Sequence, residues 1–386
     1  MEEWKKYKMG DFIDFNPTIS LKKGAVARKI TMDKLIPHSR DIYDWEYEPY
    51  SGGAKFQNGD TIMARITPCL ENGKHAFISL LDDGETAYGS TEYIVMRGIP
   101  GVSDNRFVYY LSHFPDFKNA AVKSMVGSSG RQRAQVDVLK NLEFYLPGLD
   151  EQRKIADTLS SLDDKIALNN RINHNLLTIA QSLFDERIAD NPTMNSAFKK
   201  GVLTDIASFL NGIAMQKYPI SDAEAGLPVL KIKELGQGSC DENSDRCTST
   251  IPEQYIIVDG DIIFSWSGTL LVDYWCGGTC GLNQHLFKVS STSFPGWFIY
   301  FWTKYHLDRF KRIAQDKAVT MGHIRRTDLE QAEVLIPQTP LLRTFDKEIS
   351  PLMEEYVQRR IENRRLQSMR DNLLPQIMSG SFYLTC

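Results

Sequence analysis

The sequence has no run of apolar residues long enough to cross a membrane. A helical span needs about 18 or more consecutive apolar residues, and none occurs among the 386 residues of the chain. The first residues, Met1-Glu-Glu-Trp-Lys-Lys, do not supply the apolar segment that a secretory signal peptide requires. We therefore expect a cytoplasmic protein.

Cysteine is also scarce. The chain has six cysteines at irregular spacing, which is typical of a protein from a reducing compartment. Cys240, Cys247, Cys276 and Cys280 could be considered as zinc ligands, but six residues separate the first pair and three the second, and all four lie in one half of the chain. These spacings fit known zinc motifs poorly, so we expect free thiols and no metal site.

The motifs of common enzyme classes are absent. The sequence contains no phosphate-binding Gly-x-x-x-x-Gly-Lys-[Ser/Thr], no His-Glu-x-x-His and no Gly-x-Ser-x-Gly. Asn16-Pro-Thr and Asn191-Pro-Thr are similar to the Asn-Pro-Pro-aromatic motif of adenine methyltransferases. Both lack the second proline and the aromatic residue that would stack on a flipped base, so we interpret them as turns. We expect no catalytic residue and no cofactor of the chain's own.

The charge balance is slightly acidic. The net charge is −4 and the pI about 6.0, with ordinary hydrophobic (42%) and charged (24%) fractions for a globular protein. A protein that binds duplex DNA alone is usually basic, so this balance argues against tight unaided DNA binding. It still allows a DNA-binding subunit that shares its phosphate contacts with partners.

The most informative feature that is present is a repeat with an offset of 190 residues. Leu146-Pro147 precedes a long helical pattern at Glu151–Ile188, and Ile336-Pro337 precedes a second one at Leu341–Met378. So long a period indicates two whole domains and not a solenoid. Two similar domains with two helices predict a pseudo-symmetric molecule, for which duplex DNA, itself two-fold, is a leading ligand.

The repeat continues upstream into each domain. Gly59-Asp60 precedes the strand pattern Thr61–Ile66, and Gly260-Asp261 precedes Ile262–Trp266. We predict α/β (α+β) domains at 1–148 and 195–338 and long helical segments at 149–190 and 339–380. The other expected elements are strands at Glu92–Met96, Val229–Ile232 and Leu286–Val289 and helices at Asn105–Val122 and Gly296–Gln315.

The two long helices carry matching heptad seams, apolar at the ends and polar in the middle. Polar seam residues fix register at some cost in stability. We predict an antiparallel coiled coil in which the polar middles meet, and we expect Asn169→Leu to raise the melting temperature. The second helix should have a kink or late start near Pro351 and should end near Met378. The alternative is that each helix packs on its own domain. The seam residues are Ile155, Leu159, Leu162, Ile166, Asn169, Asn173, Leu352, Tyr356, Arg359, Asn363 and Leu366.

Candidate DNA contacts are basic or amide side chains in loops and at strand ends. Arginine forks suit guanine edges or phosphates, and asparagine and glutamine suit adenine. We expect loops at Arg131 and Arg133 and at His323 to Arg326 to occupy matching places, and Asn283-Gln284-His285 to open a strand. Any of these groups could instead be solvated. The set is Lys55, Arg65, Arg131, Arg133, Lys217, Lys231, Lys233, Asn283, Gln284, His285, His323, Arg325 and Arg326.

Several strings, in order and duplicated, resemble one family. They are Leu146-Pro-Gly-Leu-Asp-Glu-Gln-Arg-Lys-Ile-Ala, Leu162-Asp-Asp-Lys-Ile-Ala-Leu-Asn-Asn-Arg-Ile-Asn, the closing Leu373-Leu-Pro-Gln-Ile-Met-Ser-Gly, and the loops at Gly127 and Thr320. The chain resembles the specificity (S) subunit of type I restriction-modification enzymes over nearly its whole length. It departs where Thr339-Pro-Leu-Leu replaces the Asp-Glu-Gln of the first repeat.

The resemblance implies a division of labour. Each recognition domain would read half of a split DNA target, and the helices would set the spacing and dock two methyltransferase subunits. S-adenosylmethionine, ATP and Mg would belong to the methyltransferase and restriction/translocase partners. The competing hypotheses are a stand-alone nuclease or methyltransferase, which would need a metal or cofactor motif, and a purely structural helical scaffold.

Overall fold

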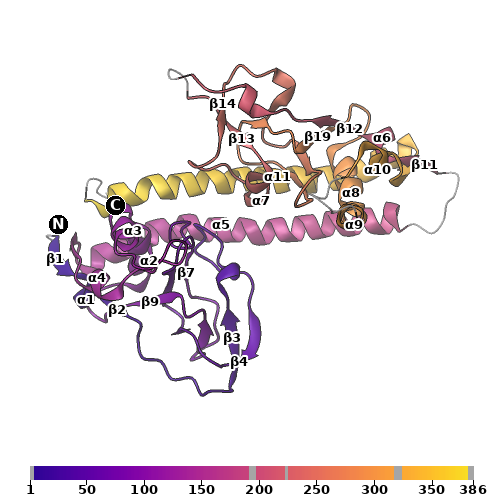
Figure 1. Cartoon of the computed structure of the whole chain (residues 1–386). Coiled ribbons are helices and arrows are strands. Elements are labelled where there is room, and N and C mark those ends of the chain that lie inside the picture. The colour runs from indigo at the N-terminus through magenta and orange to yellow at the C-terminus, as the bar shows by residue number, and fades with distance from the viewer. Residues whose placement is uncertain (1–3, 191–196, 222–224, 317–323, 381–386) are drawn as a thin grey trace. The chain divides into compact units, whose positions relative to one another are not determined.

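The computed structural model describes residues 4–190, 197–221, 225–316 and 324–380 (Figure 1). The chain forms two compact units: unit 1 contains Met1–Ala167 and Leu366–Cys386, and unit 2 contains Leu168–Arg365. Each of the two long helices therefore contributes one part to each unit. Within the described ranges, no helix has the length and apolar character that crossing a membrane requires.

Unit 1 is an α/β unit with three sheets. Its four-stranded sheets have the orders β2-β9-β6-β7 and β4-β3-β8-β5, and β1 pairs with β10. The elements are β1 (Lys5–Lys8), α1 (Met9–Phe12), β2 (Ile13–Phe15), β3 (Val26–Ile30), η1 (Met32–Lys34), β4 (Glu46–Pro49), β5 (Lys55–Phe56), β6 (Thr61–Ala64), β7 (His75–Phe77), β8 (Ala87–Gly89), β9 (Tyr93–Gly98), α2 (Asn105–His113), α3 (Pro115–Lys123), α4 (Val136–Lys140), β10 (Glu143–Leu146) and α5 (Leu149–Phe184).

Unit 2 repeats this arrangement strand for strand. Its sheets have the orders β12-β19-β16-β17 and β14-β13-β18-β15, and β11 pairs with β20. The elements are η2 (Asp185–Ala189), β11 (Phe198–Val202), α6 (Leu203–Ile206), β12 (Ser208–Asn211), η3 (Met215–Lys217), β13 (Leu227–Leu230), α7 (Ile232–Gln237), β14 (Arg246–Cys247), η4 (Glu253–Tyr255), β15 (Ile256–Ile257), β16 (Ile262–Ser265), β17 (Val272–Tyr274), β18 (Cys280–Leu282), β19 (Leu286–Ser290), α8 (Gly296–Tyr305), α9 (Leu307–Asp316), α10 (Arg326–Glu330), β20 (Glu333–Pro337) and α11 (Thr339–Met378).

The Gly-Asp pair predicted from the repeat makes the same turn in both units. Gly59 and Gly260 have φ angles of 90° and 92°, a conformation that glycine adopts readily. The following aspartates each accept a backbone N–H bond and pair with a cation: Asp60 with Arg97 at 2.6 Å, and Asp261 with Lys288 at 2.8 Å. Each pair fixes the start of the central strand, β6 or β16.

The helices expected at 105–122 and 296–315 are each two helices. Phe114 is the C-cap of α2, and Pro115 begins α3 at the position where proline's missing N–H is not needed. Phe107, Leu111 and Phe114 are buried in the core of unit 1. In unit 2, α8 ends at Tyr305 and α9 starts at Leu307.

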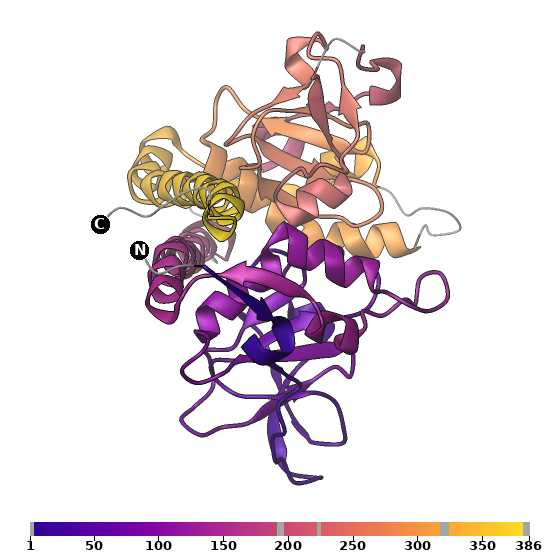
Figure 2. The ribbon, with the colours of Figure 1, turned by 90° about the vertical axis from the view of Figure 1, so that its left-hand side faces the viewer.

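The long helices α5 and α11 pair antiparallel, as predicted, and lie side by side in both views (Figures 1 and 2). In unit 1 the start of α5, with Ile155 and Leu159, packs in one core with Leu374 and Ile377 from the end of α11. In unit 2 the end of α5 and the start of α11 share the other core. All eleven predicted seam residues are buried or half-buried.

The bounds of α11 differ from one expectation and agree with another. It begins at Thr339 and continues through Pro351, so of the two possibilities expected near Pro351, a kink or a late start, the late start was wrong. Pro351 is exposed, so its ring faces away from the partner helix. The helix ends at Met378, as predicted, and Gly380 follows with a φ angle of 70°.

The polar middles of the two seams meet inside unit 2. Asn169 is fully buried, and its amide donates to Asn363 Oδ1 at 2.9 Å and to Glu362 at 2.7 Å. Its carbonyl oxygen accepts from Arg359 at 2.9 Å. Asn363 in turn donates to Asn170 at 2.7 Å. This network fixes the register, because sliding one helix by a turn would break every bond in it.

These bonds reverse the expected effect of Asn169→Leu. Leucine would remove the donor to the buried Asn363 Oδ1 and one acceptor of Arg359. Orphaning a buried polar group costs about 1–3 kcal/mol. We now expect the melting temperature to fall, with Asn363→Leu in the same chain recovering part of the loss. Thermal melts of the two variants provide the check, and a rise for Asn169→Leu alone would contradict the network.

Candidate nucleic-acid interface

Unit 1 has a cleft of about 350 Å³ that combines separate parts of its sequence. Asn16, after β2, lies in the left-handed region with φ of 56°, and it exchanges backbone and side-chain hydrogen bonds with Val95. The Asn16-Pro-Thr segment is therefore a turn, as interpreted from the sequence, whereas Asn191-Pro-Thr lies outside the described residues. Lys55 and Arg65 line the same cleft.

The two cations of this cleft are available for a ligand. Both are half-buried, and within the described part of the chain neither has a carboxylate within ion-pair distance. The Nε atom of Arg65 is buried without a hydrogen-bond partner in that same part. Gly53 also lines the cleft, and a Cβ there would lie 1.9 Å from the Gly89 carbonyl oxygen, so only glycine fits. The cleft suits an anion or an acceptor-rich base edge.

Arg133 lies beside this cleft but already has a partner. Its guanidinium donates three hydrogen bonds of 2.7–2.9 Å to the Glu92 carboxylate, and these bonds raise the pKa of Arg133. Its backbone forms bridges with Ile66 and Val126. Arg131 is exposed. A DNA contact by Arg133 would have to compete with Glu92, whereas Arg131 is unhindered.

The same backbone positions recur in unit 2 with different side chains. The Arg65 N–H donates to Glu92 O and Ala134 N–H to Arg65 O, whereas in unit 2 the Trp266 N–H donates to His285 O and Ile324 N–H to Trp266 O. Trp266 therefore stands where unit 1 has Arg65, and His285 where it has Glu92. By the same alignment Arg325 corresponds to Gln135, and the counterpart of Arg133 is His323, which lies outside the described residues.

Asn283, Gln284 and His285 form the turn before β19 and do not open the strand as expected. Asn283 is buried and accepts from the His285 N–H, and His285 Nδ1 lies 3.1 Å from the Ser267 hydroxyl. The Trp266 ring lies 6.0 Å from the His285 ring, and its indole N–H donates to Asn211 at 2.9 Å. Aromatic and amide groups thus take the place of the charged groups of unit 1.

Unit 2 has a second cleft of about 220 Å³, whose lining includes Lys231, one of the three predicted lysines, and Asn283. Lys231 forms an ion pair with Asp245, and Lys233 one with Asp241 at 3.4 Å. Lys217 is exposed, and η3 places it next to Gln216 of the cleft. Of the three lysines, Lys231 alone lines the cleft, and its pairing reduces the charge that it presents.

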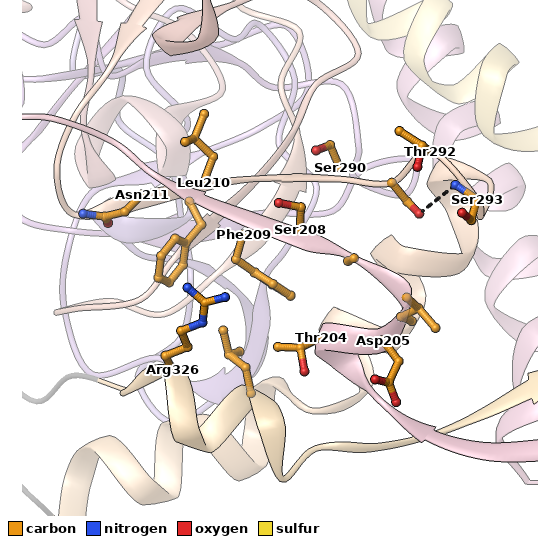
Figure 3. Close-up of a pocket in the computed structure, with 15 residues that line it drawn as sticks. Thr204, Asp205, Ser208, Phe209, Leu210, Asn211, Ser290, Thr292, Ser293 and Arg326 are labelled. Atoms are coloured by element: carbon orange, nitrogen blue, oxygen red, sulfur yellow. Dashed lines mark hydrogen bonds between the residues drawn. The ribbon is translucent and has the colours of Figure 1, made fainter.

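A larger hollow of about 660 Å³ lies between α6, β12 and α10 (Figure 3). Arg326 extends from α10 toward Phe209 of β12, and the Ser208 and Ser290 hydroxyls line the same hollow. The Arg326 side chain is 84% exposed and lies 3.7 Å from Glu330. Asn211 connects this hollow to Trp266 and so to His285. Arg325 is exposed, and its backbone begins α10.

Sequence reasoning missed Asn16, Glu92 and Trp266. Glu92 could have been found as the acidic residue that opens the predicted strand Glu92–Met96. Trp266 could have been found because Gly260 follows Gly59 by 201 residues, and the same offset places Trp266 opposite Arg65. Asn16 gave no such signal, because the fold alone brings it to the cleft. Within the described residues, no cluster of three or more His, Cys, Asp or Glu side chains could hold a metal ion.

Comparisons with known proteins agree on one family. Residues 1–178 match the family model of the type I restriction modification DNA specificity domain. The MjaIX specificity subunit of Methanocaldococcus jannaschii is 27% identical over 72% of this chain and 68% of its own length. The HindI specificity subunit of Haemophilus influenzae is 21% identical over 98% of this chain and 100% of its own length.

A solved structure shares the fold. The type I S subunit from M. genitalium covers 97% of this chain and 96% of its own, with a TM-score of 0.55 and 16% identity. A relative over nearly the whole length, a matching domain and the duplicated topology with its helix pair lead to the same assignment. Residues 1–178 are a type I restriction modification DNA specificity domain, and the chain as a whole is similar to the specificity (S) subunits of type I restriction-modification systems.

Proposed function

We propose that each unit reads one half of a split DNA target and that the two halves differ in sequence. One observation supports this most strongly: the two units place different side chains on equivalent backbone. Arg65 and Glu92 of unit 1 correspond to Trp266 and His285 of unit 2. Because base edges are distinguished by the donors and acceptors that face them, different side chains select different bases.

The chain is a non-catalytic subunit, and we propose that its partners supply the chemistry. Two methyltransferase subunits would bring S-adenosylmethionine and methylate adenine, and restriction/translocase subunits would bring ATP and Mg. The net charge of −4 supports this sharing, because partners would supply phosphate contacts. The activity would take place in the cytoplasm. A stand-alone nuclease or methyltransferase and a helical scaffold are not favoured, since the relatives along the chain are specificity subunits.

The unit 1 cleft gives the first test. The chain, assembled with methyltransferase subunits, is used to select from a randomised duplex DNA library. We expect the wild type to enrich a split motif and Arg65→Ala to relax one half, at a cost of about 1–3 kcal/mol per base contact. If Lys55 binds a phosphate, Lys55→Ala should instead lower the affinity for all sequences by the same factor.

The matched control is Lys123→Ala, which removes an exposed cation at the end of α3, away from the cleft. It should leave motif and affinity unchanged. If both cleft variants select the wild-type motif with wild-type affinity, the cleft does not contact DNA. If the wild type itself enriches no split motif, the proposed function is wrong.

A further inference from the structure

Two arginines of α11 fasten the recognition domain of unit 2 to the helix. Arg360 donates two parallel hydrogen bonds to Asp273, of β17, at 2.7 and 2.8 Å. Arg364 does the same to Asp259, in the turn before Gly260, at 2.6 and 2.8 Å. Paired bonds of this kind fix direction as well as distance. The two arginines are four residues apart, about one helical turn, so together they fix both the position of the domain along α11 and its rotation about it.

Further contacts hold both arginines in place. Arg360 lies over the Tyr356 ring at 5.2 Å, and it also donates to the Tyr356 hydroxyl at 3.1 Å. Arg364 donates to the Cys276 carbonyl at 2.6 Å, and the Gly278 N–H donates to Asp259 at 2.8 Å. Each guanidinium therefore has an orientation set by several partners at once.

The environment favours the charged forms of these pairs. The four side chains are only 19–33% exposed. Burial would raise the pKa of Asp259, but hydrogen bonds from Arg364 and from Gly278 outweigh it and lower the pKa. Pairs shielded from water in this way are stronger than exposed ones.

Unit 1 does not repeat this clamp. In the pairing of β6 with β7, Ala76 faces Ile62 as Asp273 faces Ile263 in unit 2. Asn58 precedes Gly59-Asp60 as Asp259 precedes Gly260-Asp261, and its amide is bonded to the backbone of Leu81. Neither residue offers a carboxylate to an arginine. The clamp is a feature of the second domain and not a consequence of the repeated fold.

We propose that Arg360 and Arg364 are positioning residues for DNA recognition, which restrict the complex to targets of one spacer length by holding the second recognition domain at one place on α11. This inference rests on the proposed function. A domain free to slide or rotate on the helix by a few ångströms would accept half-sites one base pair, about 3.4 Å, nearer or farther.

The test is selection from a randomised duplex library by the assembled complex, scored by the spacer between the enriched half-motifs. The wild type should enrich one spacer length. Arg360→Ala/Arg364→Ala should enrich the same half-motifs at more than one length, with the preference for the wild-type spacer falling about tenfold, equivalent to 1.4 kcal/mol. Arg360→Lys/Arg364→Lys keeps the charge but loses the paired bonds. Its preference for the wild-type spacer should therefore lie between that of wild type and that of the alanine variant.

Arg187→Ala is the control, because it removes an ion pair to Glu348 within the helix pair of unit 2. It should keep one spacer length. The inference is overturned if the folded alanine variant enriches only the wild-type spacer, whatever its melting temperature. Should that variant fail to fold, the lysine variant decides by the same criterion. Failure of the wild type to enrich any split motif would instead overturn the proposed function.

Discussion

Arg370→Ala is expected to cost about 3–5 kcal/mol of unfolding free energy, because it leaves a carboxylate buried without its counter-charge. Arg370 and Asp163 are 8% and 3% exposed, and their nearest charged atoms lie 2.6 Å apart. Tyr110 donates to the second oxygen of Asp163 at 2.7 Å, and Arg370 also donates to the His38 carbonyl at 3.1 Å. The network joins α5, α11 and the recognition domain inside unit 1. Denaturant midpoints of wild type and variant measure the loss.

The repeat supplies the matched rescue. By the 190-residue offset of the repeat, Asp163 corresponds to Met353 and Arg370 corresponds to Ala180. Both of these apolar residues are buried in unit 2. Asp163→Met/Arg370→Ala should therefore recover most of the loss, since apolar replacement of a whole buried pair is often neutral. Arg106→Ala, which breaks an exposed pair with Asp157, should cost at most about 1 kcal/mol. Equal losses for Arg370→Ala and Arg106→Ala would show that burial of the pair is irrelevant.

Unit 1 is expected to lose stability in mild acid through two buried histidines. The rings of His75 and His113 lie 4.6 Å apart, and within the described residues the Nε2 atom of each lacks a hydrogen-bond partner. Burial, with Lys118 and His38 nearby, lowers the pKa of His75 to about 3. Burial also lowers the pKa of His113, with contributions from His75 and Arg370. Both therefore stay neutral in the folded protein.

These lowered pKa values determine how the stability of the folded protein changes with pH. The unfolded chain binds protons at these histidines below about pH 6.5, whereas the folded chain does not. Stability is complete above that pH and falls by up to about 1.4 kcal/mol per histidine for each pH unit below it. His75→Phe/His113→Phe should make the free energy of unfolding nearly independent of pH between pH 7 and 5. His174→Phe, at an exposed site on α5, should leave the pH dependence of wild type unchanged. Parallel stability curves for the double variant and wild type would contradict this explanation.

The architecture could be predicted because its signals are local and repeated. The heptad seams from Ile155 and from Leu352 depend only on periodicity, and the Gly59-Asp60 and Gly260-Asp261 turns repeat with their strands. The break between α2 and α3 at Pro115 was equally local and was overlooked. The late start considered for α11 does not occur, because Pro351 lies on an exposed face where the helix tolerates it.

The site was harder to predict because its residues meet only after folding. Lys55 and Arg65 could be chosen as cations, but no sequence pattern showed that they share a cleft with Asn16. The partner of a charge was equally hidden: Glu92 lies 41 residues from Arg133, and Asp273 lies 87 from Arg360. The network around Asn169 shows the same limit, because the seam predicted which polar residues meet but not the hydrogen bonds that Asn169 forms with Asn363 and Arg359.

The most direct measurement of the central claim is the methylated motif after one recognition domain is exchanged. Residues 1–148 are replaced by the corresponding domain of another S subunit, and the motif is mapped by sequencing methylated adenines in cells with and without the chimera. Since each unit is proposed to read its own half-site, one half of the motif should change to that of the donor, while the other half stays intact. A motif altered in both halves, or unaltered in both, would contradict the account.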